Sequence, residues 1–324
     1  IMNAINAVVA TLIFLEGKIM ERVMRHFFLY LAKNQFLTNA DKRYGLRFGA
    51  SRFVAGETLA DTVAVIRDLN SKGMVVTLDH LGEFVTTKEE AAQNADECVR
   101  VIEMIDKEKL DSQLSLKLTS LGLDIETDLV MANMERIMNT AEKHGVFVTI
   151  DMEDYARFQT TIDIFKTLKE RYENIGTVIQ AYLYRSEQDV EDLRPYRPNL
   201  RLVKGAYKES PDVAFPDKKD VDENFKSIIK MHLLGGNYTA VATHDDEIIH
   251  YTIRLVREHR IPNNRFEFQM LYGIRVERQK ELANEGYTMR IYVPYGEDWY
   301  GYFMRRLAER PANVMFVLKG IFGK

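Results

Sequence analysis

Eight short apolar runs recur along the chain from about residue 60, and a segment of helical length separates each run from the next. The runs are 74–78, 114–118, 146–150, 176–183, 200–204, 239–243, 265–271 and 288–293. The helix-length segments include 88–108, 127–144, 155–173, 220–235, 245–260 and 275–285. Strands that alternate with helices predict an α/β fold with a parallel sheet. Eight such repeats match the size of a (βα)8 barrel, which takes about 250 residues.

A doubly wound open sheet is the alternative for this pattern, but it usually has fewer strands and a glycine-rich first turn. No G-x-G-x-x-G follows a strand, and the P-loop, H-E-x-x-H and G-x-S-x-G motifs are absent from the sequence as well. We therefore expect a catalytic barrel over residues 61–324. Residues 1–60 are expected to form an arm and extra helices before it, and 210–220 a long loop after the fifth strand.

Composition excludes some classes of partner. The 324 residues carry a net charge of −4, which gives no footprint for nucleic acid. The single cysteine, Cys98, suits a reducing cytoplasm and is expected to pack inside a helix. The apolar stretch 4–15 is too short to span a membrane and lacks the features of a signal peptide. Residues 1–19 are either partly added sequence, since Met20 could be a start, or an arm or helix that packs on the main domain or on a partner chain.

Polar side chains follow most of the apolar runs. In a parallel barrel the active site lies at the carboxyl ends of the strands, so these side chains are the candidates for a site. They are Asp79, Glu83, Lys117, Asp151, Glu153, Asp154, Gln180, Tyr184, Arg185, Arg201, Lys204, Tyr207, Thr243, His244, Glu267, Gln269, Arg290 and Tyr292.

Several of these residues have a structural alternative. Asp79 and Asp154 are equally suited to begin a helix as N-caps. His244 precedes two acidic residues, but we expect it to open a helix rather than to bind a metal, and no metal is expected. Lys117 could instead reach out from the bottom of the barrel.

The segment 300–313 places four residues on one helical stripe: Tyr302, Arg305, Arg306 and Glu309. A solvent-exposed stripe is the simple alternative. Two neighbouring guanidinium groups can also hold one carboxylate by charge-assisted hydrogen bonds, and tyrosines can enclose an apolar body. The implied ligand is a small carboxylate on a hydrophobic skeleton, such as an amino acid.

The chain resembles the proline dehydrogenases, and the short monofunctional bacterial form in particular. Motifs in the family's order carry this resemblance over about 70–313: "LGE" (81–83), "SLKLTSLGLD" (115–124), "DMED" (151–154), "VIQAYLYR" (178–185), "NLRLVKGAYKE" (199–209), "ATHDD" (242–246), "FEFQMLYG" (266–273) and "YVPYGEDWYGYFMRRLAERPAN" (292–313). The match does not cover residues 1–19.

The resemblance implies a distorted (βα)8 barrel whose last helix lies over the barrel mouth, and FAD bound without a Rossmann motif. It implies oxidation of L-proline to Δ1-pyrroline-5-carboxylate, with electrons passed to a membrane quinone. A cytoplasmic flavoprotein that visits the membrane surface is therefore expected.

The site residues implied by the resemblance fall into three groups. The expected catalytic residues are Asp151, Arg201, Lys117 and Tyr292. The expected substrate-binding residues are Lys117, Arg305, Arg306, Tyr207, Tyr292, Tyr302, Glu83 and Leu271, with Glu83 pairing with Arg305 as a gate. The expected FAD-binding residues are Met152, Gln180, Arg201, Val203, Lys204, Gly205, Ala206, Tyr207, Thr243, His244 and Leu271.

Two other functions stay open from the sequence. A flavin-free lyase or aldolase would use Lys117 to form a Schiff base. A non-catalytic amino-acid-binding module would use only the arginine pair. The sequence also leaves open whether Asp151 or water takes the amine proton in proline oxidation.

Overall fold

A computed structural model describes residues 52–299 and residue 302 of the chain. The described residues fall into two compact units. Residues 59–294 form one unit. In the other, Trp299 Nε1 donates to Glu57 Oε1 over 3.1 Å, and the amide of Gly296 donates to the carbonyl of Gly56 over 3.0 Å. The proposed domain boundaries at residues 60 and 61 stay a prediction.

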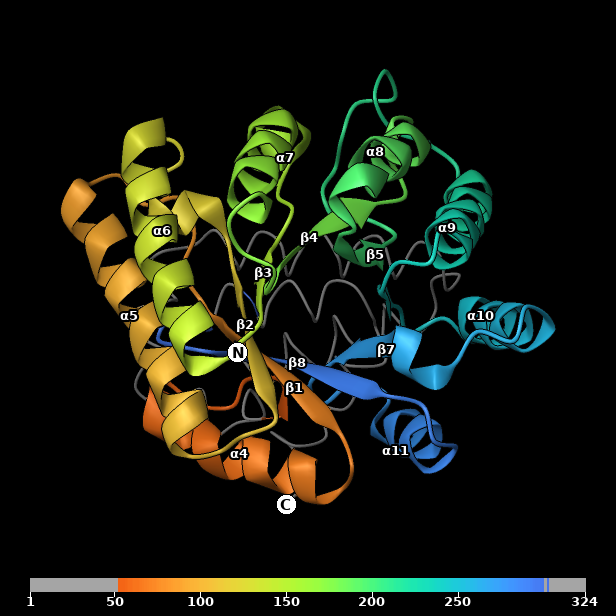
Figure 1. Ribbon diagram of the computed structural model, residues 1–324, viewed down its shortest axis with the longest axis horizontal. Helices are drawn as coiled ribbons and strands as arrows, with labels where there is room; N and C mark the ends of the chain where they lie inside the picture. Colours follow the sequence, from red (N-terminus) through yellow and green to blue (C-terminus); the bar gives the residue numbers. More distant parts are fainter. Residues whose placement is uncertain (1–51, 300–301, 303–324) are drawn as a thin grey trace, which may run out of the picture. The chain divides into compact units, whose positions relative to one another are not determined.

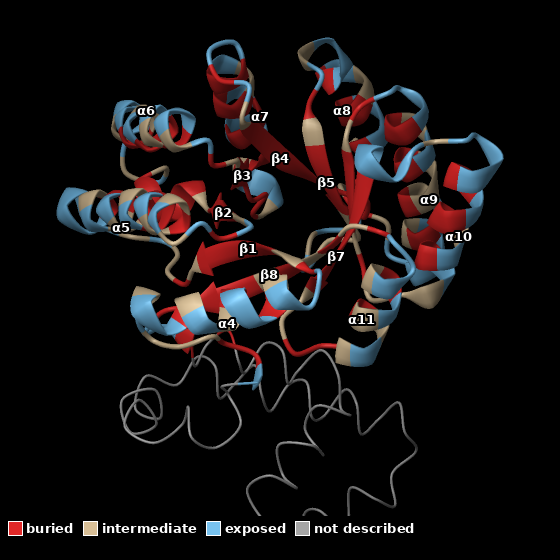
Figure 2. Ribbon diagram, turned by 60° about the horizontal axis from the view of Figure 1, so that its bottom comes forward, coloured by how far each residue is buried: buried red, intermediate tan, exposed pale blue. Residues whose placement is uncertain are grey.

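Eight parallel strands close into a barrel in chain order, which confirms the predicted fold (Figure 1). The strands are β1 (Val75–His80), β2 (Ser112–Leu116), β3 (Val148–Ile150), β4 (Ile175–Gln180), β5 (Asn199–Val203), β6 (Thr239–Ala242), β7 (Phe266–Leu271) and β8 (Met289–Tyr295). Each predicted apolar run contains one of them or overlaps it. The strands are buried along most of their length (Figure 2), as expected for a sheet covered on one face and packed inside on the other.

Helices surround the strands and expose their polar outer faces (Figure 2). They are α4 (Leu59–Ser71), α5 (Lys88–Lys107), α6 (Thr127–His144), α7 (Tyr155–Lys169), α8 (Ser186–Leu193), α9 (Lys218–Leu234), α10 (Asp246–Glu258) and α11 (Val276–Asn284). Short 3-10 turns are η3 (Leu118–Leu121), η4 (Arg194–Tyr196) and η5 (Asn263–Arg265). Helix α8 was not predicted, because eight mostly polar residues contain too few apolar positions to show a helical period.

Helix caps settle two of the structural alternatives. Thr87 and Glu90 form a reciprocal capping box at the start of α5, so Asp79 is not a cap and the N-cap interpretation was wrong for it. Asp154 does cap α7, where its side chain accepts a hydrogen bond from the amide of Arg157. Asp245 caps α10, so His244 lies just before that helix.

The second strand ends earlier than predicted. β2 stops at Leu116, and Lys117 precedes the turn η3 instead of lying inside the strand. In the turn that follows, the side-chain hydroxyl of Ser120 donates to the carbonyl of Lys117 over 2.6 Å. Lys117 is therefore at the carboxyl end of β2 and does not reach out from the barrel bottom.

The expected helices before residue 52 and the expected last helix over the barrel mouth lie outside the described residues. Cys98 is buried in α5, as predicted, and burial raises the pKa of its thiol to about 12. No helix in the described part of the chain is long and apolar enough to cross a membrane.

Candidate active site

A buried cluster of acids and bases occupies the carboxyl ends of β1, β2 and β3. Its centre is Lys117, whose Nζ lies 3.2 Å from Asp79 Oδ2 and 3.7 Å from Asp151 Oδ2. Glu83 Oε1 is 3.8 Å from the same nitrogen. The pairing of β1 with β2 and of β2 with β3 explains this, since Asp79 lies opposite Ser115, Leu116 lies opposite Ile150, and Lys117 and Asp151 directly follow these last two residues.

The charge of Lys117 is strongly fixed. Burial would lower the pKa of the ammonium, but Asp79, Asp151 and Glu83 together raise the pKa well above its usual value. Lys117 therefore stays protonated at neutral pH. A protonated lysine binds anions and is a poor nucleophile.

Asp151 has hydrogen-bond donors on both carboxylate oxygens. Oδ1 accepts from Arg201 and, over 2.8 Å, from Ser115, whereas Oδ2 accepts from the Tyr292 hydroxyl over 2.6 Å. Burial would raise the pKa of Asp151, but Arg201 and Lys117 hold it below its usual value. The pKa of Tyr292 is raised well above normal by burial and by Asp151, so the phenol keeps its proton.

Arg201 and Gln180 have buried polar atoms without a partner among the described residues. These atoms are Nε and Nη2 of Arg201 and Oε1 of Gln180. Nη1 of Arg201 donates to Asp151 and, over 3.1 Å, to Ser115. Gln180 Nε2 donates to the carbonyl of Glu153 over 3.2 Å. Unsatisfied buried donors and acceptors of this kind are costly, and their presence at a barrel mouth indicates a missing polar ligand.

Gly205 allows the chain after β5 to pass close to Tyr182. Its φ is +112°, and a Cβ at this position would lie 2.3 Å from Cδ1 of the Tyr182 ring. The amide of Tyr182 donates to the carbonyl of Lys204 over 2.8 Å, which holds the two segments together. Only glycine fits both the backbone angle and the space.

Gly205→Ala is expected to destabilise the fold by about 2–4 kcal/mol, from backbone strain together with the clash against Tyr182. Thermal unfolding checks this. Gly73→Ala is the matched control, because Gly73 has φ +74° but nothing within 4 Å of the added carbon, so it should cost only about 1 kcal/mol. Equal losses for the two variants would contradict the close approach.

Lys204 is neutralised by two carboxylates, since its Nζ pairs with Asp222 and, over 2.8 Å, with Asp245.

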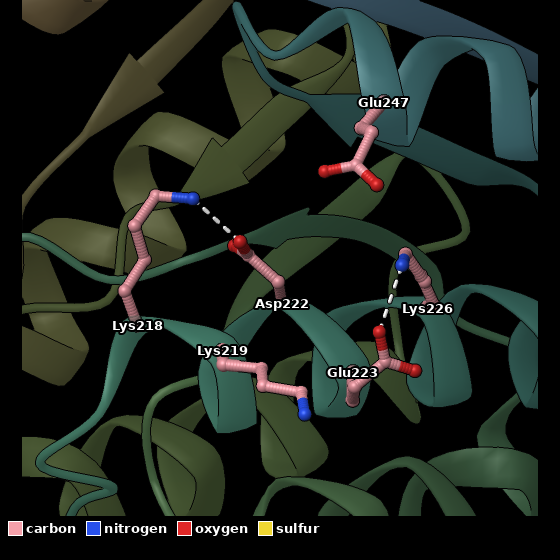
Figure 3. Close-up of a pocket in the computed structure, with 6 residues that line it drawn as sticks. All are labelled: Lys218, Lys219, Asp222, Glu223, Lys226 and Glu247. Atoms are coloured by element: carbon pink, nitrogen blue, oxygen red, sulfur yellow. Dashed lines mark hydrogen bonds and ion pairs between the residues drawn. The ribbon is translucent and has the colours of Figure 1, made fainter.

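Asp222 also lines a surface pocket at the start of α9 (Figure 3). The pocket is lined by Lys218, Lys219, Asp222, Glu223, Lys226 and Glu247. Three lysines face three carboxylates there, so the pocket offers no excess positive charge.

The ends of β6 and β7 are tied together through His244. Its Nε2 accepts from the amide of Leu271 over 3.0 Å, and its carbonyl accepts from Arg275 Nη1 over 2.6 Å. Thr243 is buried beside it, and its side-chain hydroxyl accepts a hydrogen bond from the amide of Asp245 over 3.1 Å. No group of three potential metal-binding side chains occurs within the described ranges.

The structure does not bring every strand residue to the mouth. Glu267 and Arg290 pair over 2.8 Å near the amino ends of β7 and β8, and Arg290 also donates to the carbonyl of Val76. They belong to the barrel interior and not to the site.

Of the other predicted site residues, Met152 is buried. Glu83, Val203 and Tyr207 are partly exposed at their strand ends, and Ala206 is exposed. Tyr302 is buried but belongs to the second unit, so its position relative to the barrel is not assigned. Arg305 and Arg306 lie outside the described residues.

Two residues of the cluster were not assigned from the sequence. Asp79 is a strand-end candidate in the sequence, but it belongs to none of the three groups of expected site residues, and Ser115 is predicted only as part of a strand. Strand alternation is the signal that could have found Ser115, because it lies two residues before Lys117, on the same side of the chain.

A closed parallel barrel with buried, paired charges at its strand ends is the architecture of a barrel enzyme. Comparison with known proteins defines the class further. The family model for proline dehydrogenase matches residues 62–319. The chain belongs to the proline dehydrogenase family and is an oxidoreductase that acts on proline, in the first step of proline breakdown. Membership of this family implies a flavin cofactor.

Individual relatives agree with this assignment. Proline dehydrogenase 1 of Bacillus subtilis subsp. natto is 57% identical over 302 residues, which cover 93% of this chain and 100% of the relative. Proline dehydrogenase of Deinococcus radiodurans is 45% identical over 277 residues, which cover 84% of this chain and 89% of the relative. The solved structure of proline utilization A from Bdellovibrio bacteriovorus has a similar fold, with a TM-score of 0.80 at 24% identity. The match covers 93% of this chain but only 38% of that longer protein.

Proposed function

We propose that this protein oxidises L-proline to Δ1-pyrroline-5-carboxylate with FAD as its cofactor and passes the electrons to a membrane quinone. Family membership supports the substrate. A cytoplasmic location with transient contact at the inner face of the plasma membrane is part of the proposal, because a quinone resides in the bilayer.

The observation that carries the proposal is the pair of unpartnered buried donors on Arg201 beside protonated Lys117. Proline brings a carboxylate, and a flavin brings ring nitrogens and carbonyl oxygens, so both ligands need donors and positive charge. The chemistry that FAD supplies when bound is acceptance of a hydride from the substrate.

The residues present fit a flavin. Arg201 Nε and Nη2 and Gln180 Oε1 are free to bond the polar edge of its ring system. Arg201 would also supply positive charge to a flavin held there, which would stabilise the negative charge that develops on reduction. We propose that the remaining FAD contacts come from Met152, Val203, Lys204, Ala206, Tyr207, Thr243, His244 and Leu271.

We propose that Lys117, Arg305 and Arg306 hold the proline carboxylate, and that Tyr207, Tyr292, Tyr302 and Leu271 pack around the ring. Glu83 then pairs with Arg305 over the bound substrate. Anchoring the carboxylate orients the carbon that loses hydride. Asp151 accepts hydrogen bonds on both carboxylate oxygens, and its pKa is lowered, so its role is to hold Arg201 and Tyr292 in place. Because a carboxylate with a lowered pKa is a weak base, we assign removal of the amine proton to water.

The Schiff-base alternative loses support because Lys117 is held in its protonated form by three carboxylates. An amine needs a free lone pair to attack a carbonyl.

The visible spectrum of the purified protein tests the proposal. We expect the absorbance of a bound oxidised flavin, bleached by L-proline without oxygen and restored by a soluble quinone. Persistent colour after proline addition would contradict proline oxidation, and protein without flavin that binds proline would instead favour the binding module.

A further inference from the structure

Asp79 is the carboxylate nearest to Lys117, and the proposed function assigns it no role. Both of its oxygens face the ammonium, with Oδ1 at 3.3 Å and Oδ2 at 3.2 Å from Nζ. The side chain is almost fully buried, at 2% exposure. We propose that Asp79 is a positioning residue, which holds the Lys117 ammonium where it meets the substrate carboxylate. This inference rests on the proposed function of the site.

The two other carboxylates near Lys117 are less suited to this task. Asp151 is 3.7 Å from Nζ, and its oxygens already accept from Arg201, Ser115 and Tyr292. Glu83 is 3.8 Å away on a partly exposed loop. Asp79 projects from a buried strand, so it offers the closest and most rigid partner.

The backbone of Lys117 is fixed independently of Asp79. Ser120 bonds the carbonyl of Lys117, and the next residue but one, Thr119, donates both its amide (3.1 Å) and its hydroxyl (2.5 Å) to buried Glu153. The base of the lysine side chain is thus held by the turn η3. Four flexible methylene groups remain, and only a partner at the tip can order the ammonium.

The protonation of Asp79 gives a way to test this role. Burial raises the pKa of Asp79 to about 6, although the charge of Lys117 opposes the rise. The charged and titratable groups facing Asp79 are Lys117 from the end of β2, Asp151 from the end of β3, Tyr292 from β8, Cys98 from α5 and Glu83 from the following loop.

A neutral Asp79 attracts the ammonium less, and Lys117 is then drawn toward Asp151 and Glu83. Affinity for proline should therefore be full well above pH 6, where Asp79 is ionised, and fall as the pH drops through about 6. Asp79→Asn mimics the neutral form at every pH.

The experiment compares full-length wild type, Asp79→Asn and Glu267→Gln. The control removes a buried carboxylate charge that pairs with Arg290 near the other end of the barrel. KM and kcat for proline are measured from pH 5 to 8, together with flavin content and the affinity for a five-membered-ring carboxylic acid that lacks the amine.

We expect Asp79→Asn to raise KM at pH 7.5 by about tenfold, to weaken the analogue equally, and to keep its flavin. The fall in affinity near pH 6 should disappear in this variant but remain in Glu267→Gln. Unchanged KM and pH profile in Asp79→Asn would overturn the inference, as would the same changes in both variants. A wild-type flavin that proline fails to bleach would overturn the proposed function, and this inference with it.

Discussion

Replacing Lys117 by Met is expected to lower kcat/KM for proline by about 10²–10³-fold. The ammonium is buried and protonated among Asp79, Asp151 and Glu83, and in our proposal it also meets the substrate carboxylate. Removing one partner of a buried, hydrogen-bonded charge pair costs about 3–4 kcal/mol, and each 1.4 kcal/mol corresponds to about tenfold in rate. Steady-state kinetics at pH 7.5 provide the measurement.

Lys88→Met is the control for this variant. Lys88 pairs with Glu126 on the exposed surface, where ion pairs contribute little, so kcat/KM should stay within about twofold of the wild-type value. The role assigned to Lys117 would be contradicted if both variants kept wild-type kinetics. Circular dichroism checks that the Lys117 variant is folded.

Arg305→Met should raise the KM for proline by about 10²–10⁴-fold. A carboxylate that leaves water needs charged hydrogen-bond donors. Loss of one bidentate guanidinium–carboxylate contact in a desolvated site costs roughly 3–5 kcal/mol. Arg305 lies within the matched proline dehydrogenase region, residues 62–319. Initial rates over a wide range of proline concentrations give the KM.

Arg305→Lys separates charge from geometry. Lysine keeps the positive charge but loses the planar fork, so its KM should lie between those of the wild type and Arg305→Met. A KM for Arg305→Met equal to that of the wild type would remove the arginine pair from the proposed site.

The barrel could be predicted from the sequence because strand and helix patterns repeat with little interruption. Most strand positions are buried, and some strands therefore appear as nearly continuous apolar runs, as in "VFVTI" before Asp151. The pattern failed where local hydrogen bonds decide the structure. Lys117 continues the alternation of β2 in the sequence, yet the strand ends at Leu116, and the carbonyl of Lys117 accepts a hydrogen bond from the hydroxyl of Ser120 in the following turn.

The site could be predicted less completely, since function depends on neighbours that are far apart in the chain. Asp79 follows an apolar run just as an N-cap does, and only the pairing of β1 with β2 reveals its contact with Lys117. The unsatisfied donors of Arg201 are likewise invisible in the sequence, because they become evident only when every nearby acceptor is placed. For Glu267 and Arg290 the sequence predicts a place in the site, but the structure shows that the two side chains form an ion pair inside the barrel, away from the site.

The most direct test is a crystal structure of the flavin-loaded protein with a non-reactive five-membered-ring carboxylic acid. We predict that the ligand lies at the carboxyl ends of the strands, with a carboxylate oxygen within about 3 Å of Lys117 Nζ and its ring facing the flavin. A ligand bound elsewhere, with Lys117 contacting only Asp79, Asp151 and Glu83 as it does without substrate, would contradict the account.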